Sequence, residues 1–155
     1  MTENLPSLAR KIIDGNSYMT IATADAGGSP WATPVWFAPE AYTDFFWLSR
    51  PSTRHSTNIA DRPEVGLVVF DSTVPINQGQ AVYVEAAAEQ VPPADLEAAV
   101  AVFSARSVAG GGRPWEVADV VEPSSFRLYR ARAAAHYVLD DHDTRIPVDP
   151  KQRSR

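Results

Sequence analysis

The order of its strand-like segments is the feature that most constrains what this chain can fold into. Strand patterns follow one another in runs joined by short turns, and helical patterns interrupt them only three times. A doubly wound parallel sheet needs strict alternation of strands and helices, which is absent here. Six or seven strands with only small helices therefore predict a mainly β fold, a closed antiparallel barrel.

The individual elements are inferred from apolar spacing. Alternating or continuous apolar runs of strand length predict strands over 18–24, 31–37, 43–48, 65–70 and 79–91, with one final strand or a bent pair over 126–130 and 135–139. Helical spacing predicts helices over 5–13 and 95–104. A third helix can begin at Pro51-Ser52 and must end by Pro63. The triple glycine at 110–112 predicts a flexible loop.

Composition limits the classes of function. The chain has 14 basic and 19 acidic residues and a net charge of −5, which argues against a nucleic-acid partner. It has no cysteine, so disulfides, thiolate metal sites and cysteine nucleophiles are excluded. Its three histidines, His55, His136 and His142, lack metal-ligand spacing, so no metal site is predicted. No serine lies in a G-x-S-x-G setting, and the catalytic residues stay unknown.

Length and hydropathy predict one domain in a soluble protein. At 155 residues the chain fits a single domain, which we place at 1–147, with 148–155 as a flexible tail. Polar residues break the apolar segment 5–13, so no signal peptide is predicted. No apolar run approaches the roughly 20 residues that span a bilayer. We therefore expect a cytoplasmic protein without a membrane partner.

A family resemblance rests on five segments taken in order. They are YMTIATAD, TPVWF, LSRPSTRHSTNIADRPEVGLVVFD, GQAVYVEAAAEQV and FRLYRARAAAHYVLD. Together they resemble the pyridoxamine 5′-phosphate oxidase-like proteins over roughly 8–147. The resemblance implies a six- to seven-stranded antiparallel split β-barrel of the FMN-binding type. It also implies a homodimer with the two cofactor sites in clefts at the subunit interface.

The resemblance places the flavin phosphate at the start of the second helix. The family's pattern of a hydroxyl residue, a cation and a later Asn falls on Ser52, Thr53, Arg54 and Asn58, with Arg50 close by. Hydroxyls and free N–H groups at a helix N-terminus bind phosphate, and the helix dipole favours the anion. A guanidinium adds charge-assisted hydrogen bonds. Arg54 is the first choice because it takes the family's Lys/Arg place.

The resemblance also assigns residues to the isoalloxazine ring, which needs a flat apolar slot and backbone groups for its pyrimidine edge. Two strand segments match, Thr33, Pro34, Val35 and Trp36 in one and Trp47, Leu48 and Ser49 in the other. In the family, the other subunit also contributes a Gln and a late aromatic residue to the flavin site. The matching residues in this sequence are Gln80 and Tyr129.

Plainer interpretations of these residues stay open. Ser52 and Arg54 could form a solvated helix cap, Trp36 and Trp47 could be core aromatics, and Gln80 could be a surface residue.

The function implied is that of an FMN-dependent oxidoreductase acting on a small molecule, in which a hydride passes between flavin and substrate. The parent enzyme's basic C-terminal pattern is absent, because the region reads RAAAHYVL, which speaks against pyridoxine-phosphate oxidation. One alternative is the deazaflavin F420, although Lys11 and Lys151 are the only lysines that could hold its acidic tail. A non-enzymatic flavin or haem carrier and a barrel without cofactor are also compatible with the sequence.

Overall fold

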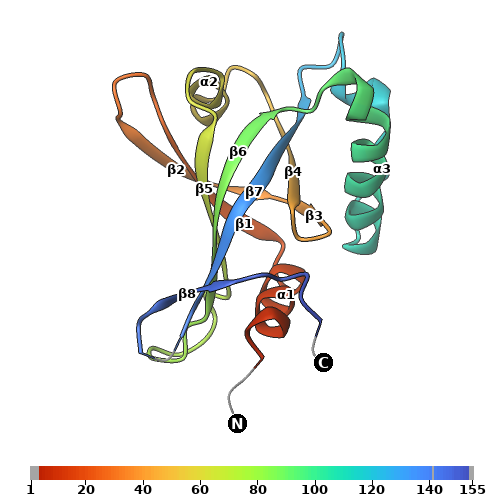
Figure 1. The fold of residues 1–155 in the computed structure, drawn as a ribbon. Helices are drawn as coiled ribbons and strands as arrows, with labels where there is room; N and C mark the ends of the chain where they lie inside the picture. The colour runs from red at the N-terminus through yellow and green to blue at the C-terminus, as the bar shows by residue number, and fades with distance from the viewer. Residues whose placement is uncertain (1–3, 141, 154–155) are drawn as a thin grey trace.

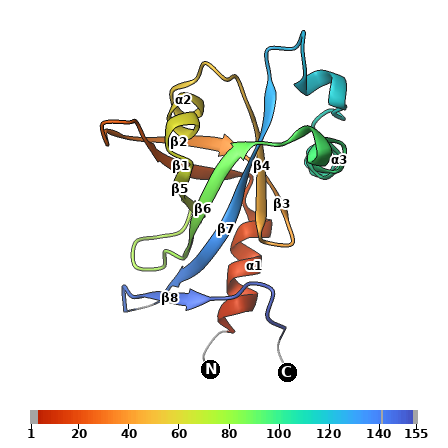
Figure 2. The same ribbon diagram turned by 45° about the horizontal axis from the view of Figure 1, so that its top comes forward.

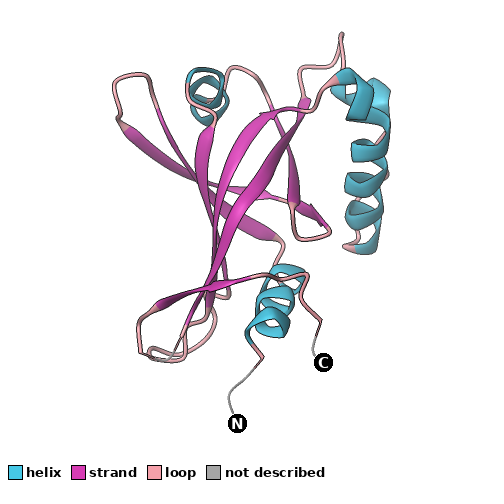
Figure 3. Cartoon of the chain, in the orientation of Figure 1, coloured by secondary structure: helices cyan, strands magenta, loops and turns pink. Residues whose placement is uncertain are grey.

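The structure is a computed structural model, and it describes residues 4–140 and 142–153. Within these residues the chain forms three α-helices, eight strands and one 3₁₀ turn (Figures 1 and 3). The helices are α1 (Leu5–Gly15), α2 (Arg54–Asp61) and α3 (Pro93–Ala109), and the 3₁₀ turn is Val117–Val120. The strands are β1 (Tyr18–Ala24), β2 (Pro30–Trp36), β3 (Ala38–Glu40), β4 (Asp44–Ser49), β5 (Glu64–Phe70), β6 (Ala81–Gln90), β7 (Arg127–Leu139) and β8 (Arg145–Val148).

One antiparallel sheet makes the barrel. Its strand order is β2-β1-β5-β6-β7-β4-β3, and β8 pairs with β7. Only Phe37, which is fully buried, separates β2 from β3. This bent segment pairs with β1 before the bend and with β4 after it, so it closes the sheet on itself. The predicted antiparallel split barrel is confirmed, and the short strands β3 and β8 come in addition to those predicted.

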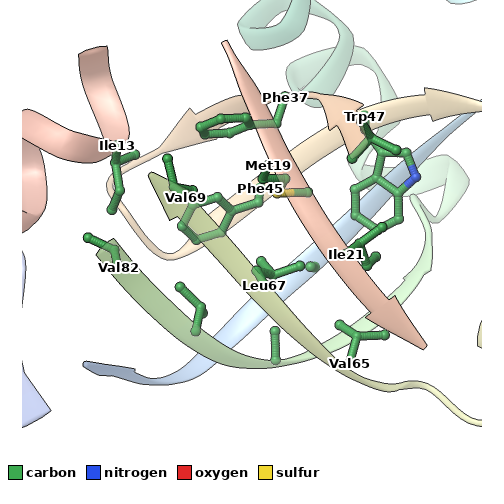
Figure 4. Close-up of a cluster of buried hydrophobic side chains, with 14 of the residues drawn as sticks. Ile13, Met19, Ile21, Phe37, Phe45, Trp47, Val65, Leu67, Val69 and Val82 are labelled. Carbon is green, nitrogen blue, oxygen red and sulfur yellow. The ribbon is translucent and has the colours of Figure 1, made fainter. Parts of the chain in front are cut away.

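Alternation along the strands fills the inside of the barrel. Met19, Ile21 and Thr23 point inward from β1 and are nearly inaccessible to solvent, as their period of two predicts. Figure 4 shows this core, in which Phe45 and Trp47 of β4 lie among the aliphatic side chains of β1 and β5. Helix α1 covers one end of the barrel with its apolar face, and α2 lies at the other end (Figure 1).

A second, smaller core lies outside the barrel. Helix α3 packs on the outer side of β3 and β4, where Phe46 and Leu128 meet Val100 and Phe103 (Figure 2). Arg130 of β7 is buried and ties the first turn of α3 to the sheet. Its guanidinium binds Glu89 Oε1 at 2.6 Å and Asp95 Oδ2 at 3.1 Å. The outer face of β4 is therefore covered as well as the inner one.

The C-terminal segment returns to α1. Val148 ends β8, and Arg10 Nη1 donates hydrogen bonds to the carbonyls of Pro150 (2.7 Å) and Gln152 (3.0 Å). The flexible tail predicted over 148–155 thus begins with a paired strand residue and anchored carbonyls. Its mobility, like the domain boundary at 147, stays a prediction. Residues 1–3, 141, 154 and 155 lie outside the described residues.

Candidate functional site

A cavity of about 550 Å³ lies on the outer side of the barrel, between β2, β4, the start of α2 and the end of α3. The residues that line it are Pro34, Val35, Trp36, Leu48, His55, Phe103, Ser107, Gly110, Gly112 and Trp115. Four of these, namely Pro34, Val35, Trp36 and Leu48, are among the residues that the sequence assigns to a flavin ring. The structure therefore brings two predicted ring segments to one cavity.

Aromatic rings form the wall of the cavity toward α3. Trp36 meets Phe103 edge-on, with ring centroids 5.3 Å apart, and Phe103 meets Trp115 in the same way at 6.0 Å. The Arg113 guanidinium lies over the Trp115 ring, 3.5 Å from its centroid. Phe103 and Trp115 are not predicted as site residues from the sequence, because they follow Trp36 by more than 60 positions and only the tertiary fold joins them.

The glycine segment after α3 is folded back on the helix by hydrogen bonds. Gly112 N–H donates to the Ser107 carbonyl at 2.8 Å, and Ser107 Oγ donates to the Arg113 carbonyl at 2.7 Å. A Cβ atom on Gly112 would lie 2.6 Å from Ser107 Oγ, so glycine is required for this close approach. The loop expected to be flexible is therefore a bonded part of the cavity wall.

The start of α2 carries a cluster of hydroxyl groups. Thr53 caps the helix, and its Oγ1 accepts a hydrogen bond from Ser56 N–H at 3.3 Å. Ser49 Oγ, at the end of β4, lies 3.1 Å from Thr53 Oγ1 and accepts from Ser56 Oγ at 3.2 Å. Thr53 and Ser49 are both predicted site residues, and their hydroxyls hold the β4–α2 turn together.

His55 joins this cluster to the cavity. Its ring is buried and lines the cavity, and its Nε2 lies 2.9 Å from Ser49 Oγ. Burial lowers the pKa of His55 below its ordinary value, which favours the neutral form of the ring. From the sequence, His55 lacks metal-ligand spacing and is expected near the phosphate end of the site rather than in a catalytic role. Its position directly after Arg54, at the start of the second helix, was the available signal for a role there.

The predicted phosphate cations lie near the start of α2 but outside the cavity lining. Arg54 is exposed, and its guanidinium lies over the Trp31 ring, 4.4 Å from the centroid. Arg50 is also exposed and lies over the Phe126 ring at 5.2 Å. Ser52 is exposed in the turn between them.

Two other predicted residues tie elements together. Asn58 is buried, and its Nδ2 donates to Thr23 Oγ1 at 3.0 Å, which fixes α2 to β1. Thr33 is half-buried in β2, and its Oγ1 lies 3.5 Å from the carbonyl oxygen of Pro34. Neither side chain lines the cavity.

Trp47 and Tyr129 lie inside the barrel. The two side chains come from paired positions of β4 and β7 and stack with centroids 5.6 Å apart. Trp47 is fully buried and Tyr129 is 3% exposed. Trp47 Nε1 is buried without a hydrogen-bond partner among the described residues. The inward face of β4 thus directs Trp47 away from the cavity, whereas the outward face directs Leu48 toward it.

Gln80 lies at the far end of the sheet. It precedes β6 in the loop after β5, whereas α2 precedes β5 (Figure 1). Since β5 has seven residues, Gln80 and the start of α2 are about 20 Å apart along the strand. A role for Gln80 at the cavity therefore requires a second chain.

A second groove of about 410 Å³ crosses the outer face of β1, β5, β6 and β7. Its lining includes Ala22, Gly66 and Val68, with Tyr83 and Tyr137 beside them. None of the three described helices contributes a residue to it. This face of the barrel is therefore open and largely apolar.

The comparisons with known proteins agree with this fold. A family model described as pyridoxamine 5′-phosphate oxidase matches residues 5–140. No curated protein is significantly similar to the chain in sequence. Within the described residues no helix is long and apolar enough to cross a membrane, and no three His, Asp or Glu side chains gather as a metal site.

Three solved structures show the same fold. The heme binding protein from Mycobacterium smegmatis is 17% identical with a TM-score of 0.76, and the match covers 97% of this chain and 60% of that one. The heme storage protein HutZ from Vibrio cholerae is 20% identical with a TM-score of 0.65, over 83% and 90% of the two chains. An F420 reductase is 19% identical with a TM-score of 0.56, over 77% and 87%. This chain thus spans about 60% of the length of the mycobacterial protein.

Proposed function

Because this chain belongs to the pyridoxamine 5′-phosphate oxidase family, we propose that it binds FMN in the cavity beside α2 and acts as an oxidoreductase on a small molecule. The observation that carries the proposal is the meeting of Pro34, Val35 and Trp36 with Leu48 and His55 around one space of about 550 Å³. Small-molecule sites are mostly apolar clefts of about 300–1,000 Å³. Bound FMN would supply the hydride chemistry, and the protein would orient it and exclude water.

The β2 side of the cavity fits the flavin ring. Trp36 gives a flat apolar surface, and Leu48 extends it from β4. In the sheet of the described residues β2 pairs with β1 alone, so its other edge offers backbone groups without ladder partners. The Phe37 N–H donates to the Ser17 carbonyl, so by alternation Thr33 and Val35 direct their backbone groups at β1, and the free edge offers the Pro34 carbonyl and the Trp36 N–H to the pyrimidine edge. Those hydrogen bonds would stabilise the more electron-rich reduced ring.

The start of α2 fits the phosphate. The N–H groups of a first helical turn have no intrahelical acceptor, and the helix dipole attracts an anion to them. Arg54 is the first residue of α2, and its exposed guanidinium can turn from the Trp31 ring toward a phosphate beside the helix. Since Thr53 already caps the helix, we assign the charge of the site to Arg54 and its donors to the helix backbone.

A second copy of the chain would complete the site. Gln80 lies about a strand length from α2 within one chain, so it can reach a cofactor only from a partner. The open groove on β1, β5, β6 and β7 gives the partner an apolar surface, with Glu85 and Arg145 of opposite charge at its edge. We therefore propose a homodimer built on this face.

A haem group is the second candidate. His55 is an imidazole in the cavity lining whose neutral form is favoured by burial, and imidazole nitrogen is a common ligand of haem iron. F420 has less support, because no Lys or Arg lines the cavity, and Arg50 and Arg54 near the start of α2 are few cations for its longer acidic tail.

The visible spectrum of the purified protein separates the candidates. If FMN is retained through purification, the protein should show the two visible absorption bands of a flavin. If the purified protein is colourless, added FMN should bind to it with a stoichiometry of one per chain. A sharp Soret band would instead favour haem. Colourless protein that leaves added FMN unchanged would overturn the proposal.

A further inference from the structure

The cavity has two unlike sides. The β2 side consists of residues assigned to the flavin ring, whereas the far side comes from the end of α3 and the segment after it. Phe103, Ser107 and Trp115 supply the side chains there, and Gly110 and Gly112 bring the backbone close. Ser107 holds this wall together through its bonds to Gly112 and Arg113.

The lining carries no Asp, Glu, Lys or Arg residue. The two arginines of this region make bonds elsewhere. Arg113 covers the Trp115 ring and pairs with Asp119 at 3.4 Å, and Arg106 donates to the Asn16 carbonyl at 2.8 Å. An anion placed against this wall would lose water without gaining a cation, which is costly. An uncharged molecule meets no such penalty.

Two neutral polar groups remain available at the wall. Ser107 Oγ gives its proton to the Arg113 carbonyl, so its lone pairs can accept a hydrogen bond. His55 uses Nε2 toward Ser49, and within the described residues its Nδ1 makes no hydrogen bond. A ring compound with a hydroxyl or amino substituent can use these groups while its faces contact the aromatic side chains.

We propose that the compartment of the cavity next to the continuous wall of Trp36, Phe103 and Trp115 binds the substrate, and that the substrate is an uncharged, flat aromatic compound with a polar substituent. This inference rests on the proposed function, because it assumes that the flavin ring occupies the β2 side of the same cavity. Phosphorylated substrates are disfavoured, because no cation lines the compartment and the neighbouring Arg113 guanidinium already contacts the Trp115 ring and Asp119. Aromatic substrates gain from edge-on and offset contacts with its rings.

The test compares two probes of the same ring system, 2-naphthol and 2-naphthyl phosphate, by calorimetric titration of the FMN-loaded full-length protein. We expect 2-naphthol to bind about a hundredfold more tightly than its phosphate ester. Replacing Trp115→Ala should weaken 2-naphthol about five- to tenfold, and Trp115→Phe should retain most of the affinity. Val108→Ala, on the exposed side of α3, is the matched control and should change nothing.

FMN binding, followed by flavin fluorescence, separates this inference from the proposed function. If FMN binds but the two probes bind equally, or Trp115→Ala has no effect although the circular dichroism is unchanged, the substrate class is wrong and the flavin site stands. If FMN does not bind, the proposed function fails, and the probes are titrated into the flavin-free chain. Binding of 2-naphthol that depends on Trp115 would then uphold the compartment, and its absence would overturn it.

Discussion

Two aromatic clusters lie on opposite sides of the sheet and differ in what surrounds them. Inside the barrel, Trp47 and Tyr129 stack nearly parallel and are closed off from solvent. Outside it, Trp36, Phe103 and Trp115 meet edge-on and surround a cavity, and both tryptophans are only half-buried. Residues of the same type thus stabilise the fold on one side and are available to a ligand on the other. The side of the pleat to which a residue belongs decides which role it has.

The largest effect should follow from the inner cluster. Replacing Trp47→Ala leaves a void in a closed core, so we expect a loss of about 3–5 kcal/mol in the free energy of unfolding. Urea denaturation followed by circular dichroism measures it. A loss below about 1 kcal/mol would mean that Trp47 is not a core residue of this kind.

The outer cluster should show the opposite pattern. Replacing Trp36→Ala removes a flat contact from the cavity while α3 keeps its other partners on the sheet. We expect FMN affinity to fall about tenfold, with a change in unfolding free energy of about 1 kcal/mol or less. Flavin fluorescence and urea denaturation of the same preparation give both numbers. A large stability loss with unchanged FMN affinity would reverse the contrast between the clusters.

A smaller effect is expected from Arg54, which lies near the outer cluster and is assigned to the FMN phosphate. Replacing Arg54→Ala should weaken FMN about fivefold and leave riboflavin unchanged, because only FMN carries the phosphate. Parallel titrations with the two flavins measure the difference. Equal losses for both flavins would remove Arg54 from the phosphate site.

The smallest effect that we expect is a pH dependence of the unfolding free energy caused by His55. Burial lowers the pKa of His55 below its ordinary value of 6.5, so the unfolded chain binds this proton more tightly than the folded one. The contribution of neutral His55 to the free energy of unfolding is therefore complete above pH 6.5. It is lost as the pH falls through and below that value. We expect the loss to be about 1 kcal/mol or less, and His55→Gln should reduce it. Burial also lowers the pKa of His136, so part of the slope should remain in that variant.

The sequence predicted the barrel because its signals are local. Alternation of Met19, Ile21 and Thr23 is visible without any tertiary information, and the structure confirms it. β3 escaped prediction because three residues containing Pro39 carry no periodic pattern. β8 lies in a charged, proline-containing segment and becomes a strand only through its pairing with β7.

The site was predictable only in part. The β2 and α2 segments carry a recognisable order of residues, and four of the residues chosen line the cavity. Residues 45–48 of β4 are all apolar, because α3 buries the outer face of this strand and the barrel core buries the inner face. The sequence therefore shows no alternation that would tell that Trp47 points inward and Leu48 points toward the cavity. The wall from Phe103 to Trp115 depends on the docking of α3, which no local pattern reveals.

The central claim is that FMN occupies the cavity outside the barrel, and a blocking variant tests it most directly. A Cβ atom on Gly110 would point toward Trp36 at 3.9 Å without backbone strain, so Gly110→Phe should fill the cavity, whereas Gly15→Phe projects into open space. FMN titrations of the wild type and the two variants, followed by flavin fluorescence, are the measurement. We predict saturable binding by the wild type and Gly15→Phe, and loss of most of it in Gly110→Phe. Unimpaired binding by a folded Gly110→Phe variant, or no binding by the wild type, would contradict the account.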